Sequence, residues 1–201
     1  DYTLPNSQPE FPALGLIVSG GHSQLVFFRD HFDYTLLGQT NDDAIGEAFD
    51  KVAKILGLPY PGGPSIAKKS LGGNAKAYPL PKAKMSERYD FSFSGLKTAV
   101  LYRVKDEGLK IKDKQFVEQM CCEIQQAIID VLLKKTLQAA KDYKVKTIIL
   151  GGGVSANKEL RKQLAQKIQK EIPAAKYLIP DTALSTDNAL MIAVTAYFHR
   201  T

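Results

Sequence analysis

The sequence predicts an α/β fold in which three strands come first and strands and helices alternate afterwards. Short β-rich runs at 14–19, 24–29 and 32–38 are separated by glycine or aspartate turns at hairpin distances. The resulting order, βββαβαβα, does not fit a simple doubly wound dinucleotide fold, which alternates from its first strand. It fits the ribonuclease-H-like lobe of the actin-like ATPase fold (sugar kinase/actin superfamily), with a helical or irregular insertion at about 57–114.

Composition and length allow either one well-filled core or one lobe with a subdomain. The 201 residues are 44% hydrophobic and 24% charged, which is ordinary for a globular chain with one well-filled core. No apolar run approaches the roughly 20 residues that span a bilayer, and no signal peptide pattern opens the chain, so we expect a cytoplasmic protein without a membrane partner. Residues 1–13 hold three prolines without periodicity and are predicted to be a linker or a truncated edge. Residue 1 is Asp rather than Met, so we expect the chain to start inside a longer protein.

Charge and cysteine usage leave the partner open. The formal net charge is +6. An excess of Lys and Arg favours an anionic partner such as nucleic acid, but a merely soluble basic surface would show the same excess. The two cysteines, Cys121 and Cys122, are neighbours in an apolar helical pattern, so we predict core packing in a reducing compartment rather than a disulfide.

The first predicted helix spans 42–56. Its apolar residues recur at intervals of three and four, two aspartates stand at its start, and Gly57 follows its end. From 57 to 94 the periodicity fails, and prolines and glycines abound. A long irregular stretch in a compact chain is usually functional.

Regular structure is predicted again from Ser94, whose hydroxyl is expected to cap a helix that runs to Gly108. A long amphipathic helix is expected at 115–143, because its apolar residues form one stripe. The remaining predicted elements are a strand at 147–150, a helix at 157–168, a strand at 177–179 and a helix at 186–199.

The first candidate site is the run from Ile17 to Ser23, where one strand turns into the next. Gly20 and Gly21 remove side chains, so backbone amides can approach an anion closely, and the flanking serines add hydroxyl groups. This is what a phosphate cradle needs, although a plain glycine hairpin would have the same sequence. His22 by itself is more typical of a hydrogen-bonded structural residue than of a ligand.

The second candidate site runs from Gly151 to Asn157, after a predicted strand and at the start of a helix. Three consecutive glycines permit a tight turn and let a ligand approach the positive end of the helix. The Asn157 amide offers a paired donor and acceptor that suit a nucleoside edge or ribose. The spacing is not that of a GxGxxG dinucleotide motif, and a structural turn is the alternative. Two glycine turns on one lobe predict that residues 14–201 form a nucleotide-binding lobe.

Two acidic residues are further candidates. Gly46 and Asp50 lie on the predicted helix face opposite its apolar stripe. A mid-helix glycine costs about 1 kcal/mol relative to alanine, so we expect something to approach that face. Asp50 could then hold ribose hydroxyls, although a solvated acidic face is the preferred interpretation of the local pattern. Asp187 begins the last helix and could ligate a metal, although helix capping is favoured there.

Other chemistries lack their motifs. The three histidines never stand at helical ligand spacing, and no HExxH, CxxC, Walker A lysine motif or nucleophile elbow occurs. The chain therefore cannot supply a complete histidine-based metal site by itself. The irregular stretch interleaves cationic and aromatic residues, which is typical of contact with looped RNA, but a solvated surface is the alternative.

Taken in order, these motifs resemble those of the TsaD family over nearly the whole chain, and the bacterial branch more than the archaeal one. The resemblance includes the sequences LIVSGGHSQLV, GLPYPGGP and FSFSGLKTA. The runs that carry it are 16–26, 42–54, 57–64, 91–99, 151–157 and 186–189.

The resemblance implies transfer of a threonylcarbamoyl group from threonylcarbamoyl-adenylate to the adenosine beside the anticodon of tRNA. It implies one divalent metal ion per intact subunit (iron or zinc), ATP or threonylcarbamoyl-adenylate as nucleotide ligand, and TsaB-like and TsaE-like partner proteins. By this resemblance, the residues that touch the adenylate and its phosphate would be Ile17, Val18, Ser19, Gly20 and Gly21. Asp50 and Gly63 would flank the nucleoside, Asn157 would contact it, and Asp187 would ligate the metal.

Two departures from the family pattern limit what this chain could do alone. The paired HxxxH histidines of the family would lie just upstream of Asp1 and are absent together with the first lobe, and the chain stops soon after its last predicted helix. We therefore expect this chain by itself to be inactive in tRNA modification, and no residue is assigned as catalytic. Direct transfer on a positioned substrate fits the lack of a dedicated nucleophile. The alternatives are a small-molecule kinase or ATPase on the same actin-like fold, and a nucleotide-binding scaffold protein.

Overall fold

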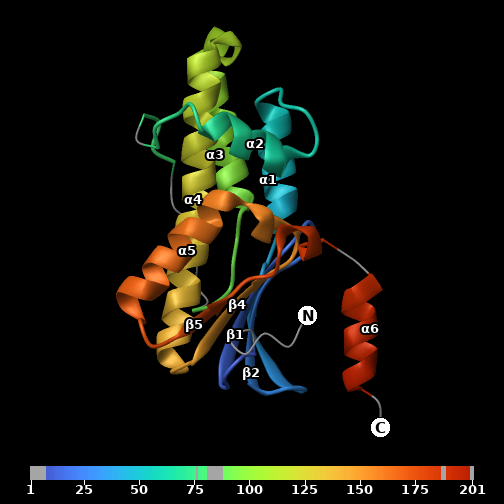
Figure 1. Ribbon diagram of the computed structural model, residues 1–201. Helices are drawn as coiled ribbons and strands as arrows, with labels where there is room; N and C mark the ends of the chain where they lie inside the picture. Colours follow the sequence, from blue (N-terminus) through green and yellow to red (C-terminus); the bar gives the residue numbers. More distant parts are fainter. Residues whose placement is uncertain (1–7, 76, 81–87, 187–188, 200–201) are drawn as a thin grey trace.

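A computed structural model describes residues 8–75, 77–80, 88–186 and 189–199. Within them lies a five-stranded sheet with the order β3-β2-β1-β4-β5. Its antiparallel meander consists of β1 (Ala13–Val18), β2 (Ser23–Asp30) and β3 (Asp33–Gln39). The strands parallel to β1 are β4 (Thr147–Gly151) and β5 (Lys176–Leu178). The predicted meander and the α/β order are confirmed (Figure 1).

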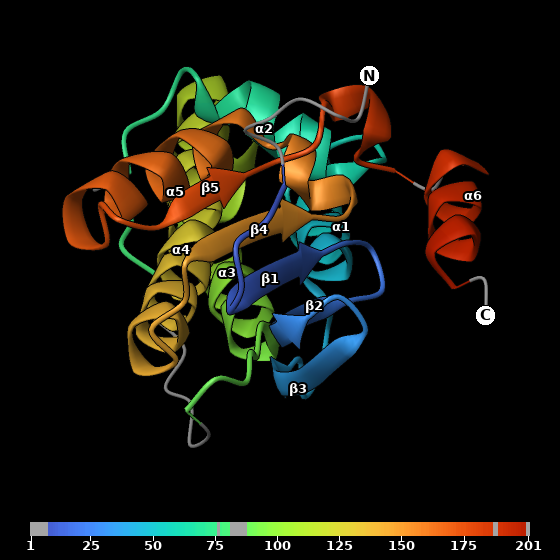
Figure 2. The same cartoon turned by 60° about the horizontal axis from the view of Figure 1, so that its bottom comes forward.

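Six α-helices lie in the described part of the chain. They are α1 (Ile45–Ile55), α2 (Gly62–Ser70), α3 (Ser94–Glu107), α4 (Lys114–Asp142), α5 (Lys158–Glu171) and α6 (Ala189–Phe198). Short 3-10 turns lie at Gly108–Lys112, Gly153–Ala156 and Thr182–Leu184. Figures 1 and 2 show α4 passing along one face of the sheet, with α1 and α3 beside it, whereas α6 stands apart from the sheet.

One hydrophobic core lies between the sheet and the helices that cover it. Alternate residues of β1, namely Leu14, Leu16 and Val18, are fully buried, because side chains two apart on a strand share one face. Met120 and Cys121 of α4 are also fully buried, as predicted for the cysteine. Burial raises the pKa of the Cys121 thiol to about 12, so it stays protonated and unreactive near neutral pH. Each large apolar side chain removed from water contributes roughly 1.5–3 kcal/mol to stability.

The Asp42 carboxylate makes contacts that differ from those predicted for the starts of two helices. Its oxygens accept hydrogen bonds from the Phe93 backbone N–H at 2.8 Å and from the hydroxyls of Ser92 and Ser94. The Ser94 side chain therefore does not cap α3, and that prediction is wrong. Asp42 lies outside α1, which begins at Ile45, because its carboxylate ties the loop before α1 to the start of α3. Burial raises the pKa of Asp42, but these hydrogen bonds outweigh it, and the pKa lies below its ordinary value of 3.8.

The stretch 57–94, predicted to be irregular, contains helix α2. Its only buried apolar side chain is that of Ile66, which is too little to produce a periodic pattern. The first N–H of α2, that of Gly62, donates to Asp50 Oδ1 at 2.6 Å, so a residue of α1 starts the helix. The last helix also begins later than predicted, at Ala189, with 187 and 188 outside the described residues.

The segment predicted to be a linker or truncated edge is attached to the sheet where the structure describes it. The Glu10 backbone N–H donates to Thr147 Oγ1, and the Thr147 hydroxyl donates to the Glu10 carbonyl, each at 2.8 Å. The Lys146 N–H donates to the Pro12 carbonyl at 2.8 Å. Residues 8–12 therefore run beside the start of β4. Among the described helices, none is both long and apolar enough to cross a membrane.

Candidate nucleotide site

The first glycine turn joins β1 to β2. The Ser19 N–H donates to the His22 carbonyl at 2.8 Å, and the His22 N–H donates to Ser19 Oγ at 3.0 Å. A Cβ built at Gly20 or Gly21 would meet no described atom within 4 Å, and neither residue has a positive φ. Crowding and backbone conformation therefore do not explain these glycines. What they supply is bare backbone facing open space, as an anion site requires.

The start of α1 packs directly against this turn. A Cβ at Gly46 would lie 2.7 Å from Gly20 Cα and 2.9 Å from the Ser19 carbonyl oxygen, and the Gly46 N–H donates to that oxygen at 3.1 Å. Gly46 is the second residue of α1, not mid-helix as predicted, but the expected close approach to it is confirmed, and the approaching group is the turn itself. The Ser23 hydroxyl oxygen, fully buried, accepts from the Ile45 N–H at 2.8 Å. Ser23 therefore holds α1 in place and is enclosed in the protein.

The second glycine turn follows β4 and meets the end of β1. Gly152 has a φ of +87°, and a Cβ there would lie 2.4 Å from the Val18 carbonyl oxygen. Only glycine fits this position, for reasons of both conformation and space. Because β1 and β4 are parallel, with Ile17 opposite Gly151, their carboxyl ends meet at the same sheet edge. The sheet thus brings the two glycine turns together.

Asn157 has less freedom than its sequence context suggests. Its Oδ1 accepts from the N–H groups of Glu159 and Leu160, each at 3.0 Å, and so caps α5. Its Nδ2 donates to Gln125 Oε1 at 2.9 Å. The predicted pair of donor and acceptor is therefore mostly used within the fold. One N–H of Nδ2 is left for a ligand.

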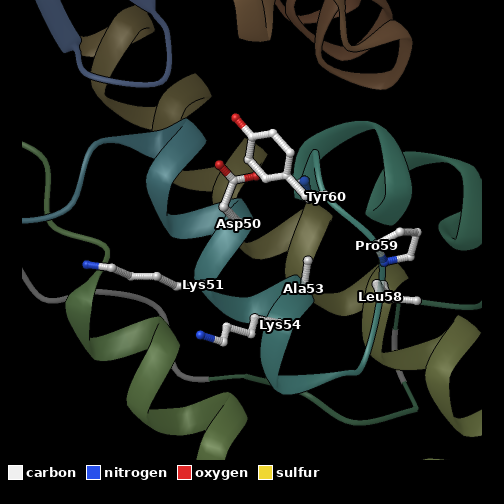
Figure 3. A pocket seen from close by; sticks show the side chains of 8 residues that line it. Asp50, Lys51, Ala53, Lys54, Leu58, Pro59 and Tyr60 are labelled. Atoms are coloured by element: carbon white, nitrogen blue, oxygen red, sulfur yellow. The ribbon is translucent and has the colours of Figure 1, made fainter.

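Asp50 lies one helical turn after Gly46 on α1. Its Oδ1 accepts from the Gly62 N–H, and a Cβ at Gly62 would lie 2.6 Å from Asp50 Cα, so α1 and α2 are in backbone contact there. Gly63 follows at the second position of α2. The Tyr60 side chain points to the same side as that of Asp50 in Figure 3 and is 84% exposed. A cavity of about 290 Å³ is lined by Asp50, Lys51, Ala53, Lys54, Leu58, Pro59, Tyr60 and Gly62.

The charge of Lys51 is committed to neighbouring carboxylates. Its Nζ contacts Asp43 Oδ1 at 2.5 Å and Glu47 Oε1 at 2.8 Å. These hydrogen bonds raise the pKa of Lys51 and hold its side chain against α1 and the residues just before it. Lys51 is therefore poorly placed to meet a phosphate, and the groups that face open space in this region are backbone amides.

Comparison with known proteins decides the family. The family model named TsaD, tRNA N6-adenosine threonylcarbamoyltransferase, matches residues 2–194. The chain belongs to the TsaD family. Relatives that carry this enzyme name include those of Geobacillus kaustophilus, 48% identical over 192 residues, and Dehalococcoides mccartyi strain CBDB1, 50% identical over 190 residues. Both alignments cover 94% of this chain but 54% and 55% of the relatives, so the chain spans about half their length.

One solved structure with a similar fold is the crystal structure of T. kodakarensis HypF. The TM-score is 0.53 at 14% sequence identity, over 85% of this chain and 22% of that chain. At so low an identity the likeness concerns the fold alone. The five-stranded sheet with its helices fits the actin-like, ribonuclease-H-like fold expected of a TsaD-family lobe.

Most TsaD-family site residues expected from the sequence lie at or near one edge of the sheet. Ile17 to Gly21 form the end of β1 and the first turn, beside Gly151 to Gly153. Asp50 is one turn along the helix that packs on the first turn, and Asn157 follows the second turn after one short 3-10 turn. The contact of these residues with a ligand stays a prediction. RNA contact by the cationic stretch at 57–94 also stays a prediction, and part of that stretch lies outside the described residues.

Asp187, the expected metal ligand, lies outside the described residues. Its neighbour Thr186 is close to the second turn, since a Cβ at Gly153 would lie 3.9 Å from Thr186 Cγ2. The described residues contain no group of three or more His, Cys, Asp or Glu side chains that could hold a metal ion. This part of the chain does not by itself fit a complete metal site.

The sequence interpretation missed two residues that shape the site. Asp42 organises the residues around Ser94, and Gln125 holds the Asn157 amide. Gln125 did carry a signal, because it stands four residues after Cys121 and three before Ile128, on the apolar side of an amphipathic helix. A polar side chain in such a position needs a hydrogen-bond partner when it is buried.

Proposed function

We propose that this chain is the nucleotide-binding lobe of an enzyme that transfers a threonylcarbamoyl group from threonylcarbamoyl-adenylate to the adenosine beside the anticodon of tRNA. The observation that supports this most is the meeting of two glycine turns at one sheet edge in a chain of the TsaD family. The name of the relatives supplies the class of reaction, a transfer to N6 of a tRNA adenosine. That transferase name also disfavours the kinase, ATPase and scaffold alternatives.

The adenylate would bind across the two turns. The backbone amides of Gly20 and Gly21 would donate to the phosphate, as successive N–H groups do in anion sites. Asp50 would accept from the ribose hydroxyls through Oδ2, because Oδ1 is used by the Gly62 N–H. Gly63 would flank the nucleoside, and Asn157 would donate its remaining N–H to it.

The transfer itself needs positioning more than a protein nucleophile. The carbamoyl carbon of the adenylate is activated by its bond to the phosphate oxygen. The N6 amine of the tRNA adenosine would attack this carbon and lose a proton to solvent, the carbon–oxygen bond would break, and AMP would leave with the bonding electrons. Holding both reactants in line supplies much of the acceleration in such reactions.

We also propose that the intact protein binds one iron or zinc ion with Asp187 as a ligand. The other ligands would be the paired HxxxH histidines that the family resemblance implies, and the described residues hold no metal-binding cluster of their own. The partners proposed for the intact protein are tRNA and TsaB-like and TsaE-like proteins. Only the tRNA is implied by the name of the relatives.

The test is isothermal titration of the full-length protein with a threonylcarbamoyl-adenylate analogue that cannot be transferred. We expect saturable binding by the wild type. In Gly20→Ala we expect affinity to fall about tenfold or more, because the methyl group would occupy the space of the phosphate. The melting temperature should be unchanged, since a Cβ there meets no described atom within 4 Å. A wild type that binds no analogue would overturn the proposal, and unchanged affinity in Gly20→Ala would exclude the phosphate cradle.

A further inference from the structure

A buried glutamine on α4 connects α2 to the second glycine turn. Gln125 is 7% exposed, and both ends of its amide are used. Its Nε2 donates to Ser70 Oγ, and its Oε1 accepts from Asn157 Nδ2, each at 2.9 Å. Ser70 ends α2, and Asn157 caps α5. Gln125 therefore bridges three elements that are remote in sequence.

The direction of these hydrogen bonds is fixed from both ends. The first N–H groups of α5 can only donate, so they hold Asn157 Oδ1 toward them and turn Nδ2 toward Gln125. At the other end the Ala67 carbonyl can only accept, so the Ser70 hydroxyl donates to it at 2.8 Å and offers its oxygen to Gln125. Gln125 satisfies both neighbours in only one orientation of its amide.

These hydrogen bonds determine which groups Asn157 can still offer to a ligand. Both lone pairs of its Oδ1 are taken by α5, and one hydrogen of its Nδ2 is taken by Gln125. The remaining hydrogen can only be donated. A nucleoside bound there must present an acceptor, such as a ring nitrogen of adenine.

We propose that Gln125 is a positioning residue that fixes the place and rotation of Asn157 Nδ2, so that its remaining hydrogen is donated to the bound nucleotide. The inference rests on the proposed function, because it takes that ligand to be an adenosine nucleotide. Helix α2 adds a second effect, since its first N–H is held by Asp50 and its last turn by Gln125. Gln125 thereby also sets the placement of Asn157 relative to Asp50, the two residues expected to contact the nucleoside.

The variant that tests this is Gln125→Leu in the full-length protein, titrated with the same adenylate analogue. Leucine keeps the volume approximately but leaves Asn157 Nδ2 without its acceptor. We expect affinity to fall about tenfold, the loss of one well-placed hydrogen bond to the ligand. The matched control is Gln126→Leu, because Gln126 also joins α4 to α5, through Gln163 at 2.8 and 2.9 Å, but does not touch Asn157. The control should lose stability and keep its affinity.

A double variant separates positioning from general damage. If Gln125 acts through Asn157, then Gln125→Leu should weaken binding little further in an Asn157→Ala background. Should Gln125→Leu not fold, Ser70→Ala removes the other partner of Gln125 and is expected to weaken binding about two- to threefold. Wild-type affinity in the variant that folds, or fully additive losses in the double variant, would overturn the inference. Both of these results require that the wild type binds the analogue, so they would leave the proposed function standing. A wild type that binds no analogue would instead overturn the proposed function itself.

Discussion

At the scale of single residues, four glycines in and around the two turns fall into two kinds. Gly46 and Gly152 are crowded by the backbone of the first turn and of β1, whereas Gly20 and Gly21 face open space. The crowded pair is explained by the fold alone, because a side chain there would collide with main-chain atoms. The open pair is not explained by packing, and a ligand that approaches the backbone would explain it.

Gly46→Ala should destabilise the protein by about 1–3 kcal/mol, the usual effect of overpacking, because its Cβ would lie 2.7 Å from Gly20 Cα. Gly95→Ala is the matched control in another helix, where a Cβ would meet no described atom within 4 Å. Alanine there should be neutral or stabilising by up to about 1 kcal/mol. Urea unfolding measures the stability of both variants against the wild type. Wild-type stability in Gly46→Ala would show that the first turn can shift to make room for the added Cβ.

The residue types in the sequence predicted part of the site's geometry. A close backbone approach was predicted at Gly46 and is confirmed, although Gly46 lies in the first turn of α1, whereas ligand approach at the glycine runs stays a prediction. The Asn157 amide was predicted to serve a ligand with both its donor and its acceptor, and it serves α5 and Gln125 first. That could not be predicted, because Gln125 precedes Asn157 by 32 residues and meets it only through tertiary packing.

At the scale of elements, side chains from one segment start or hold another. Asp42 ties the loop before α1 to the start of α3, and Asp50 of α1 holds the first N–H of α2. These carboxylate contacts explain why the helix ends predicted from local sequence patterns differ from those in the structure. The strands and α1, α4 and α5 followed from apolar periodicity, whereas α2, with Ile66 as its one buried apolar residue, offered none.

Asp42→Ala should cost about 1 kcal/mol of stability at pH 7, a modest value because Asp42 is exposed in part. The hydrogen bonds place the folded-state pKa of Asp42 below 3.8, so its contribution is complete above the unfolded-state pKa of about 3.9 and disappears as the pH falls through the folded-state value. The stability difference between wild type and variant should therefore shrink at pH 3. Urea unfolding at pH 7, 5 and 3 measures it, and a difference independent of pH would contradict this account.

Asp50→Asn separates the helix contact from the expected ribose contact. An asparagine can keep its carbonyl oxygen on the Gly62 N–H, so the start of α2 should persist and the melting temperature should change little. Its amide nitrogen would replace Oδ2 and remove the acceptor for the ribose hydroxyls. We expect analogue affinity to fall about tenfold, and titration calorimetry measures it. Asp50→Ala should lose both affinity and stability; equal affinity in wild type and Asp50→Asn would exclude the ribose role.

At the scale of the whole molecule, the sequence predicted the fold class because the order of elements is a global property that small boundary errors do not change. The site was predictable only in outline. The parallel pairing of β1 with β4 determines which turns meet, and that pairing joins Ile17 to Gly151 across most of the chain.

We expect this chain alone to yield no threonylcarbamoyl-adenosine when it is incubated with tRNA, ATP, threonine, bicarbonate and the other pathway proteins. It spans about half the length of its relatives, for example 54% of the one from Geobacillus kaustophilus. The full-length protein in the same mixture should form the modified nucleoside. Mass spectrometry of digested tRNA detects it, and product from the chain alone would show that this lobe suffices.

The hydrogen bonds between Glu10 and Thr147 join residues 137 positions apart in the sequence. Contacts of such long range form slowly, because a large loop must close before they stabilise anything. During synthesis the first glycine turn leaves the ribosome long before its counterpart after β4. The meeting of the two glycine turns is therefore a late product of folding, and a ligand that bound across them would stabilise only the chain that has already completed its sheet.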